Sequence, residues 1–224
     1  MRKKLQKILT ATGTMLILSA LFLCVYNIKQ SSEAFEQSQE VLTELKDIIP
    51  EPESSSSDEP YEEIETPYQE DYTNPADDLF APYEPEPTKE QPAPIELDGN
   101  YYCGYITLPV LGLELPVADG WSYEALKYSP CRYSGSSAEN NMRIAAHNYN
   151  NHFGRIENLN SGDEIIFTDT EGVHHHYQVD NTQYVDGSDV DGMFSGQQQQ
   201  WDITIFTCTL SGKSRVTVRA VSAE

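Results

Sequence analysis

Basic residues are scarce in this chain. Its 224 residues include 14 Lys and Arg against 36 Asp and Glu, and the formal net charge is −22. A protein that binds nucleic acid neutralises phosphates with clustered Lys and Arg. Four of the 14 basic residues stand together in the first seven positions, and the rest are scattered. This balance excludes nucleic acid as a partner.

Cysteine is also scarce, with four residues in the whole chain. Such a low content excludes a scaffold built on disulfides. Outside the apolar N-terminal run the chain has Cys103, Cys131 and Cys208, and an odd number leaves at least one unpaired. A Cys103–Cys131 disulfide and two separate buried thiols both remain open. In either case we expect Cys208 to be free.

No complete metal-binding motif is present. The three consecutive histidines at positions 174–176 would place only the first and third on one strand face, whereas a zinc site needs three or four organised ligands. We interpret them as a solvated hairpin face. Asp186, Asp189 and Asp191 lack the spacing and the final Glu of an EF-hand, and we interpret them as a polar loop. We therefore expect neither a metal nor an organic cofactor.

One long run has no charge at all. Residues 8–28 are mostly Leu, Ile, Val, Phe, Ala and Met, and as a helix they would span roughly 30 Å, the thickness of a bilayer core. The basic residues 1–7 precede this run, so the positive-inside rule predicts a cytoplasmic tail, a single-pass signal anchor and an extracellular remainder. The alternative is a cleaved signal peptide, but a short apolar core and a clear cleavage site are missing.

Residues 29–100 contain 21 acidic and three basic residues and are rich in Pro and Ser. Such a composition cannot bury enough apolar surface to fold. We expect a largely disordered spacer, with a helical stalk over residues 33–49 as an option because apolar residues recur there with helical spacing. Beyond Pro50 we expect no fixed structure.

Residues 101–224 form the globular part, which is long enough to bury a core. Many short β-prone runs separated by turn residues predict a mainly β fold, a closed barrel or a sandwich. Short helices are expected at Ser122–Tyr128 and Phe153–Leu159. The expected strands are Tyr105–Pro109, Leu113–Val117, Met142–Ala146, Glu164–Thr168, Val173–Val179, Thr182–Val185, Trp201–Thr207 and Arg215–Val221.

The last two of these strands suggest a reactive thiol. Strand residues alternate between faces, so Ile203 and Ile205 face the core while Phe206 and Cys208 face away. Arg215 opens the next strand beside Cys208, and a neighbouring cation favours the thiolate. A thiol nucleophile also needs a proton partner. His147 suits that role because the apolar run MRIAA delivers it to a loop.

These residues resemble the sortases, cysteine transpeptidases of Gram-positive cell surfaces. The resemblance covers residues 101–224 in order and includes ITLPVLGLELPV, YSGSSAENNMRIAAHNY, FGRIENLNSGDEIIF and TIFTCT. It implies a sortase-type closed β-barrel of about eight strands with short helices, after a transmembrane helix and a spacer. Ala146 before the His, the residues Phe206 and Thr207 before the Cys, and a short Cys-to-Arg loop depart from the common pattern and leave the subclass open.

The resemblance implies that Cys208 attacks a C-terminal LPxTG-like sorting signal of a secreted protein and forms a thioester. His147 would protonate the leaving amine, and Arg215 would hold the substrate and stabilise the oxyanion. The acceptor would be the amine of a peptidoglycan precursor or of a pilin lysine. Asn148, Thr207 and Thr209 are further candidates for substrate binding. Some sortases bind calcium, which keeps that role open for the three aspartates.

Two alternatives remain at this point. A pilin-polymerising sortase commonly has a lid motif before the barrel and a second membrane helix after it, and the sequence shows neither, which favours anchoring. A non-catalytic binding module on a stalk would not depend on Cys208. Replacing Cys208 with Ala discriminates the enzyme from the binding module.

Overall fold

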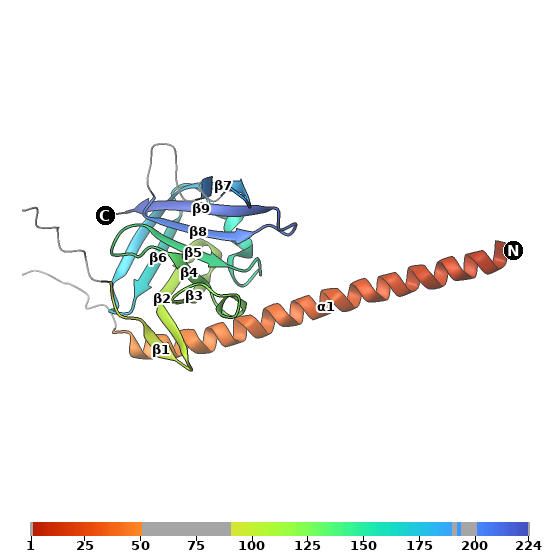
Figure 1. Ribbon diagram of the computed structural model, residues 1–224, viewed down its shortest axis with the longest axis horizontal. Helices are drawn as coiled ribbons and strands as arrows, with labels where there is room; N and C mark the ends of the chain where they lie inside the picture. The colour runs from red at the N-terminus through yellow and green to blue at the C-terminus, as the bar shows by residue number, and fades with distance from the viewer. Residues whose placement is uncertain (1, 51–90, 190–191, 194–200, 224) are drawn as a thin grey trace, which may run out of the picture.

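The computed structural model describes residues 2–50, 91–189, 192–193 and 201–223, and the side chains of residues 2–5 and 8 are not described. A single long helix, α1 (Arg2–Ile48), runs past one side of a β-barrel (Figure 1). The N-terminal half of α1 projects away from the barrel, and its C-terminal part lies against it.

Nine strands form one sheet, in the order β1-β2-β3-β4-β5-β8-β9-β7-β6. A further pairing between β2 and β6 joins the two sides of this sheet, so β2 to β9 close into an eight-stranded barrel with β1 attached outside. The prediction of a closed barrel of about eight strands is confirmed. The strands are β1 (Ile95–Leu97), β2 (Asn100–Leu108), β3 (Leu113–Ala118), β4 (Cys131–Ser134), β5 (Met142–Ala146), β6 (Glu164–Asp169), β7 (His174–Asp186), β8 (Ile203–Cys208) and β9 (Ser214–Ser222).

Short 3-10 helices connect the strands. They are η2 (Pro109–Leu111), η3 (Ala125–Lys127) and η4 (Phe153–Asn158). Two of them fall where short helices are predicted from the sequence. The sequence predicts η2 only as a turn, and Gly112 ends it in the left-handed conformation, with φ 60°, which glycine adopts without steric cost.

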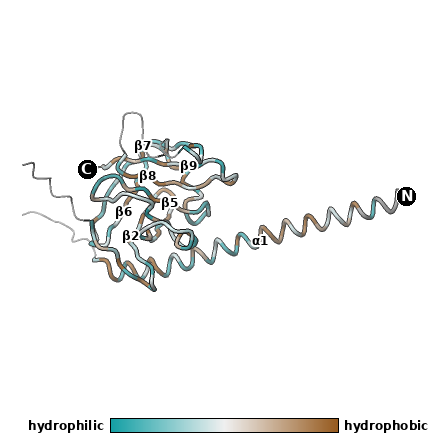
Figure 2. The backbone as a smooth tube through the Cα atoms, viewed as in Figure 1, coloured by the Kyte–Doolittle hydropathy of each residue, from teal (hydrophilic) through white to brown (hydrophobic). Residues whose placement is uncertain are grey.

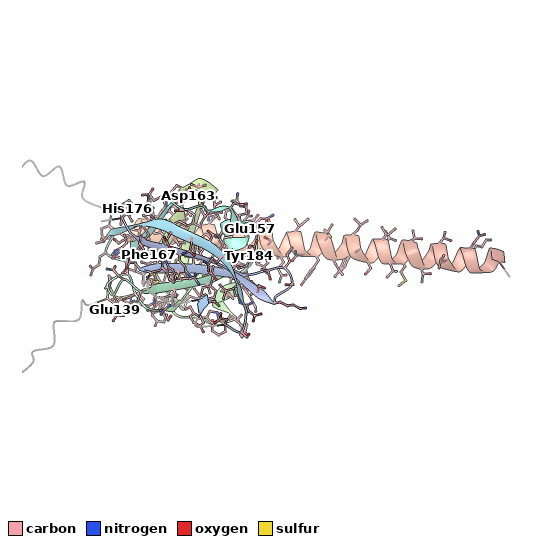
Figure 3. The ribbon with its side chains drawn as sticks, turned by 90° about the horizontal axis from the view of Figure 1, so that it is seen from above. Glu139, Glu157, Asp163, Phe167, His176 and Tyr184 are labelled. Carbon is pink, nitrogen blue, oxygen red and sulfur yellow. The ribbon has the colours of Figure 1, made fainter. Side chains whose placement is uncertain are left out.

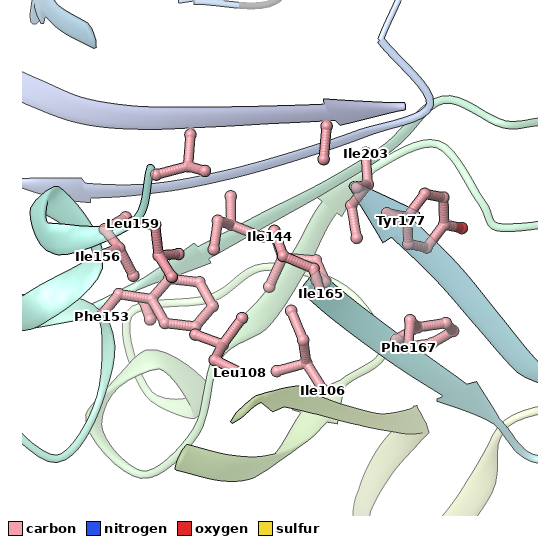
Figure 4. Packing of buried hydrophobic residues seen from close by; sticks show 14 of the residues in the cluster. Ile106, Leu108, Ile144, Phe153, Ile156, Leu159, Ile165, Phe167, Tyr177 and Ile203 are labelled. Atoms are coloured by element: carbon pink, nitrogen blue, oxygen red, sulfur yellow. The ribbon is translucent and has the colours of Figure 1, made fainter. Parts of the chain in front are cut away.

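The barrel interior is a continuous apolar core in which side chains from opposite strands interdigitate (Figure 4). Ile203 and Ile205 of β8 and Val216 and Val218 of β9 belong to it, as strand alternation predicts. The opposite face of β8 is also covered, because Phe206 packs in a second cluster with Ala145, Val185 and Met193. Both faces of β8 are therefore fixed by packing, and the end of this strand is a rigid support.

Strand β7 differs from the prediction. The sequence indicates two strands, Val173–Val179 and Thr182–Val185, because the polar residues between them read as a break. In the structure one strand of 13 residues runs through, with an irregularity between Val179 and Asn181 in its pairing with β9. A bulge absorbs the extra residue without ending the strand.

The boundaries of the predicted spacer also change. Residues 29–48 continue α1 without a break, and residues 95–97 form β1, which pairs with β2. The helical option over residues 33–49 is therefore the one that the structure shows, although the helix is packed and not a free stalk. Hydropathy along the chain changes within α1, from the apolar projecting half to the mixed docked part (Figure 2). The prediction of disorder between residues 51 and 90 lies outside the described residues.

Candidate active site

A pocket of about 270 Å³ opens at one end of the barrel, where β5 and β8 end and β9 begins. His147, Cys208 and Arg215, the three residues predicted to act together, all line it. The full lining consists of Trp121, Tyr123, Leu126, Tyr133, Ala145, Ala146, His147, Gly187, Met193, Phe206, Thr207, Cys208 and Arg215.

Strand pairing explains why three residues so distant in sequence meet here. β5 and β8 are parallel neighbours, with Ala146 opposite Thr207, so His147 and Cys208 follow at the same edge. β8 and β9 are antiparallel, and Cys208 pairs directly with Arg215. Parallel strands end at the same edge of a sheet, whereas a hairpin returns the chain to it. Two pairings thus bring a His, a Cys and an Arg to one edge.

A buried hydrogen bond locks two of these strand ends together. The Thr207 hydroxyl donates to the Ala146 carbonyl at 2.8 Å, and Thr207 is almost fully buried. It therefore joins the residue before Cys208 to the residue before His147. The sequence suggests Thr207 as a substrate contact, but its only hydroxyl proton is already used inside the barrel. The geometry instead gives this side chain a positioning contact.

Cys208 differs sharply from the other two cysteines of the barrel. Cys208 is exposed at the pocket, whereas Cys103 and Cys131 are buried and form no disulfide. Their thiols donate to the Val117 and Ser129 carbonyls. Burial raises the pKa of Cys103 to about 12 and that of Cys131 to about 11. Of the two alternatives, the structure shows two separate buried thiols, and Cys208 is the exposed cysteine of the barrel.

The guanidinium of Arg215 is held by the β8–β9 hairpin. Its Nη1 donates to the carbonyls of Gly212 at 3.0 Å and Ser214 at 3.2 Å. A Cβ at Gly187 would lie 3.0 Å from Nη1, a tight contact from which the guanidinium would have to shift by a few tenths of an ångström. No hydrogen bond within the described residues uses Nε or Nη2 of Arg215. These two nitrogens are available to an incoming carbonyl or carboxylate oxygen.

His147 stacks in a row of three rings. The ring centroids of His147 and Tyr149 are 5.2 Å apart, and those of Tyr149 and His152 are 5.7 Å apart. His152 is completely buried, and neither of its ring nitrogens has a hydrogen-bond partner among the described residues. Desolvation by burial lowers the pKa of His147, and desolvation together with the nearby His147 lowers the pKa of His152 to about 4.

The loop that carries this row is tightly closed. The Tyr149 carbonyl accepts hydrogen bonds from the amides of His152 and Gly154, both at 2.9 Å. Arg155 anchors the loop by donating to the carbonyls of Asn150 and Leu111, also at 2.9 Å. A catalytic histidine in other thiol enzymes has an orienting polar side chain, but no such partner of His147 is found in the described part of the chain. Ring packing holds His147 instead.

The other two predicted substrate contacts lie outside the pocket lining. Asn148 packs on the turn, where its side-chain oxygen comes within 2.9 Å of the position a Cβ at Gly154 would take. The Thr209 hydroxyl donates to the Ser214 carbonyl at 3.1 Å and closes the β8–β9 hairpin. Both residues support the loops beside the pocket.

An aromatic wall that the sequence pattern does not predict forms one side of the pocket. Trp121 contacts Tyr123, with ring centroids 4.8 Å apart, and Tyr133, at 6.2 Å. Tyr133 in turn meets Phe206 at 5.6 Å. The segment from 121 to 128 shows no regular periodicity, so the sequence does not reveal that its aromatic residues face Cys208. The gathering of aromatic residues around the expected short helix was the available signal.

A buried arginine supports another part of the pocket lining. Arg219 donates to the carbonyls of Gly192 and Met193 and to the side chain of Gln183, and it stacks on Trp201 with 4.3 Å between its Cζ and the ring centroid. These contacts hold Met193 at the pocket. Strand alternation alone places Arg219 on the outer face of β9 and gives it no role.

The histidine and aspartate clusters considered from the sequence have other partners. Residues 174–176 contact Thr168, Asp169 and Glu164 of β6 one by one across the hairpin. Asp186 and Asp189 accept hydrogen bonds within their own loop, whereas Asp191 lies outside the described residues. No group of three potential metal ligands occurs in the part of the chain that the structure describes.

Comparison with known proteins identifies the family. A model of the sortase domain matches residues 106–223, more than half of the chain. A search of curated proteins found no match. Among solved structures, the chain is similar to a sortase D5 transpeptidase of Clostridium perfringens, with 27% identity and a TM-score of 0.48, covering 55% of this chain and 79% of that one.

Two further structures show comparable similarity. A sortase C of C. perfringens, solved with the C-terminal cell wall sorting motif, has 22% identity and a TM-score of 0.48 over 55% of this chain and 71% of that one. Sortase C1 of Streptococcus agalactiae has 22% identity and a TM-score of 0.49 over 58% and 71%. The match of the family model decides the assignment: this chain belongs to the sortase family of cysteine transpeptidases.

Proposed function

We propose that this sortase cleaves an LPxTG-like C-terminal sorting signal and transfers the cleaved protein to an amine at the cell wall, with Cys208 as nucleophile. The observation that carries the proposal is the meeting of His147, Cys208 and Arg215 at one pocket. Three separate strands deliver them there, and each end is fixed by packing or by a hydrogen bond.

The first half of the reaction forms a thioester. His147, whose pKa is lowered by burial and whose ring is therefore largely neutral at pH 7, accepts the proton of the Cys208 thiol. The sulfur attacks the carbonyl carbon of the scissile peptide bond, and the carbonyl becomes an oxyanion. The carbon–nitrogen bond then breaks, His147 returns its proton to the leaving amine, and the acyl group stays on Cys208.

The second half transfers the acyl group. The nitrogen of the acceptor amine attacks the thioester carbonyl, and its proton passes to His147. The carbon–sulfur bond breaks, a new amide forms and Cys208 leaves as the thiolate. The thiolate regains the proton from His147, so the enzyme ends as it began.

Arg215 serves both halves in this proposal. Each tetrahedral intermediate carries its negative charge on the former carbonyl oxygen, and a positioned cation stabilises it more than the substrate. The hairpin carbonyls and Gly187 fix the guanidinium on one side. Its remaining nitrogens can then donate to the substrate without rearrangement.

Residues 8–28 act as the membrane anchor in this proposal, with residues 1–7 in the cytoplasm and the barrel outside the cell. Support comes from α1, which is long and apolar enough to cross a membrane, and from the basic residues on its N-terminal side. The same helix packs on the barrel through its C-terminal part, so the anchor and the catalytic domain are one continuous structure.

The test uses the full-length chain in detergent with peptides varied around LPxTG and NPxTN. Intact mass spectrometry should detect an acyl adduct on the protein, and the mass of the adduct identifies the preferred motif. Cys208→Ala should abolish the adduct. Adding either a peptidoglycan-type amine or a lysine side chain should release it, and the more effective amine identifies the acceptor class.

Matched variants assign the roles. His147→Gln keeps a polar side chain of similar size and should slow acylation. Arg215→Lys keeps the charge but loses the planar guanidinium, and it should lower the acylation rate more than it weakens binding of the peptide. The absence of an adduct with every peptide, together with a Cys208 that does not react with a small thiol reagent, would overturn the proposal.

A further inference from the structure

A membrane span and a docking helix are combined in α1. No Gly or Pro occurs between Gly13 and Pro50, and the helix continues from Arg2 to Ile48. Sharp kinks need Pro, Gly or a local bulge. The apolar run and the docked part of α1 therefore share one axis, so the orientation of the barrel relative to the bilayer follows from how α1 docks.

The docked part of α1 is tightly attached to the barrel. Five residues, four in the helix and one directly after its end, are buried against the barrel, and their spacing of three and four residues is that of a helix stripe. These residues are Ala34, Ser38, Leu42, Leu45 and Ile49. Polar contacts lie beside them: Gln39 donates to the Glu114 carbonyl at 3.0 Å, and the Lys46 ammonium lies 2.6 Å from the Glu114 carboxylate.

The distance between the bilayer and the barrel is short. Ala34, the first buried residue, stands six positions after Ile28, the last residue of the apolar run. Six positions correspond to a rise of about 9 Å along the helix. Any part of the barrel that extends toward the N-terminus of α1 therefore approaches the surface of the membrane that α1 crosses.

The pocket end of the barrel is the part that extends in that direction. The hairpin between β8 and β9 projects toward the N-terminal half of α1 (Figure 1). The view from above agrees, because Tyr184 and Glu157 lie on the side of the projecting helix and His176 and Glu139 on the far side (Figure 3). In the sheet, Tyr184 pairs with Val216, next to the Arg215–Cys208 pair.

The exposed residues of this end have the chemistry of a membrane interface. Leu210 at the hairpin tip is 98% exposed, and Tyr123 and Trp121 on the pocket rim are 75% and 41% exposed. Lys213 completes the hairpin tip and is also exposed. Aromatic residues and lysines with apolar neighbours concentrate at the boundary between lipid and water. A fully exposed leucine side chain, by contrast, is unfavourable in water.

We propose that this rim, formed by Trp121, Tyr123, Leu210 and Lys213, lies in the interfacial region of the bilayer that α1 crosses, so that the Cys208 pocket opens toward the membrane surface. The inference rests on the proposed anchoring by residues 8–28. The proposal adds an orientation of the barrel, in which the rim contacts the lipid surface. A substrate held at the membrane then reaches the pocket while it remains at the membrane.

The experiment measures depth in the bilayer for the full-length chain in phosphatidylcholine nanodiscs. An environment-sensitive fluorophore is attached at Leu210→Cys in a background of Cys24→Ala and Cys208→Ala, because the remaining Cys103 and Cys131 are buried. Nitroxide-labelled lipids then quench probes near the bilayer. The matched control is Glu139→Cys in the same background, on the far side of the barrel.

The expected result is several-fold stronger quenching at position 210 than at position 139. A probe on the native Cys24, in the chain with Cys208→Ala, reports the anchor itself. Strong quenching at Cys24 with equal, weak quenching at positions 210 and 139 overturns the orientation and leaves the anchor standing. Weak quenching at Cys24 overturns the anchoring and the orientation together.

A second variant tests the cause. Leu45→Glu places a charge at a fully buried position of the docked helix and should free the barrel from α1. Quenching at position 210 should then fall to the level of position 139, while Cys24 stays quenched. Quenching at position 210 that survives Leu45→Glu shows that docking of α1 does not set the orientation and overturns that part of the proposal.

Discussion

At the scale of single residues, the pocket depends on buried side chains that hold its exposed side chains in place. Cys208, His147 and Arg215 line the pocket, and two buried residues support them: Thr207, which is also part of the lining, and His152, which is not. The lining residues sit at strand ends and in loops, which would be mobile without support. The buried pair supplies that support, through a hydrogen bond in one case and through ring packing in the other.

Thr207→Val should lower both stability and activity. Valine fills the same volume but removes the hydroxyl that joins Thr207 to the Ala146 carbonyl, which costs about 1–2 kcal/mol for a buried hydrogen bond. The acylation rate should fall because the His147 and Cys208 ends are no longer tied. Urea unfolding and single-turnover acylation measure the two effects.

Thr207→Ser is the matched control, since it keeps the hydroxyl and loses one methyl group. It should restore most of the acylation rate. If the valine and serine variants acylate equally slowly, the methyl group and not the hydrogen bond is what matters.

His152→Phe should remove a pH dependence of stability. The pKa of His152 is about 4 in the folded protein, against an ordinary value of 6.5. Between these values the unfolded chain binds a proton that the folded protein does not, so stability falls as pH decreases from about 6.5 to 4. At pH 5 the loss of stability relative to neutral pH is about 2 kcal/mol.

Phenylalanine keeps the ring next to Tyr149 but cannot take up a proton. The free energy of unfolding, measured with urea at pH 7 and pH 5, should therefore fall less between these pH values in the variant than in the parent chain. A half-exposed histidine, His176, provides the control as His176→Phe. An identical loss in the parent chain and in His152→Phe would contradict the prediction.

At the scale of secondary-structure elements, the docked part of α1 acts as part of the barrel domain. It covers β3 and the neighbouring cluster that contains Tyr102, Ala118 and Cys131. A shortened chain that begins at the barrel alone would expose this surface. The helix that the sequence presents as a continuation of the anchor is therefore also a structural element of the catalytic domain.

Leu45→Ala should test this role. Leu45 is fully buried between α1 and the barrel, and truncation of a buried leucine costs about 2–5 kcal/mol. Ile48→Ala in the same helical turn is the control, because Ile48 is 53% exposed and alanine suits a helix. Chemical unfolding, followed by tryptophan fluorescence, should show a large loss in the free energy of unfolding for Leu45→Ala and little change for Ile48→Ala.

At the scale of the whole molecule, the path of the chain determines how the barrel is held. The first described stretch ends at Pro50, whose carbonyl lies against Gly172 in the turn between β6 and β7. The Ala93 carbonyl accepts a hydrogen bond from the hydroxyl of Thr170, which belongs to this turn. Pro50 and Ala93 thus lie at the same turn of the barrel. Under the proposed anchoring, α1 sets the separation between the membrane and the barrel.

The whole molecule should contain a single reactive thiol outside the apolar run. Cys103 and Cys131 are buried, and burial raises their pKa to about 12 and about 11, so neither forms a thiolate at pH 8. Iodoacetamide on the native chain should label Cys208 but neither buried thiol, and urea should release both for labelling. Cys208→Ala is the control, and peptide mapping that shows a Cys103–Cys131 disulfide would contradict the prediction.

Much of the architecture could be predicted from the sequence because it depends on local patterns. Alternating apolar residues predict β8 and β9 and the faces that enter the core, and the uncharged run predicts the membrane segment. The order of His147, Cys208 and Arg215 along the chain was enough to select them as candidates. Boundaries were less accurate where polar residues interrupt a pattern without ending it, as at the bulge of β7.

How distant segments meet follows from the folded chain and not from any local pattern. The parallel pairing of β5 with β8 places His147 beside Cys208, and no short stretch of residues encodes which strands become neighbours. The aromatic wall, the buried His152 and the docked face of α1 also depend on contacts between segments far apart in the chain. The amino-acid sequence alone established which residues are chemically able to act, since reactivity belongs to a side chain. The fold established where these side chains lie, because position depends on long-range packing.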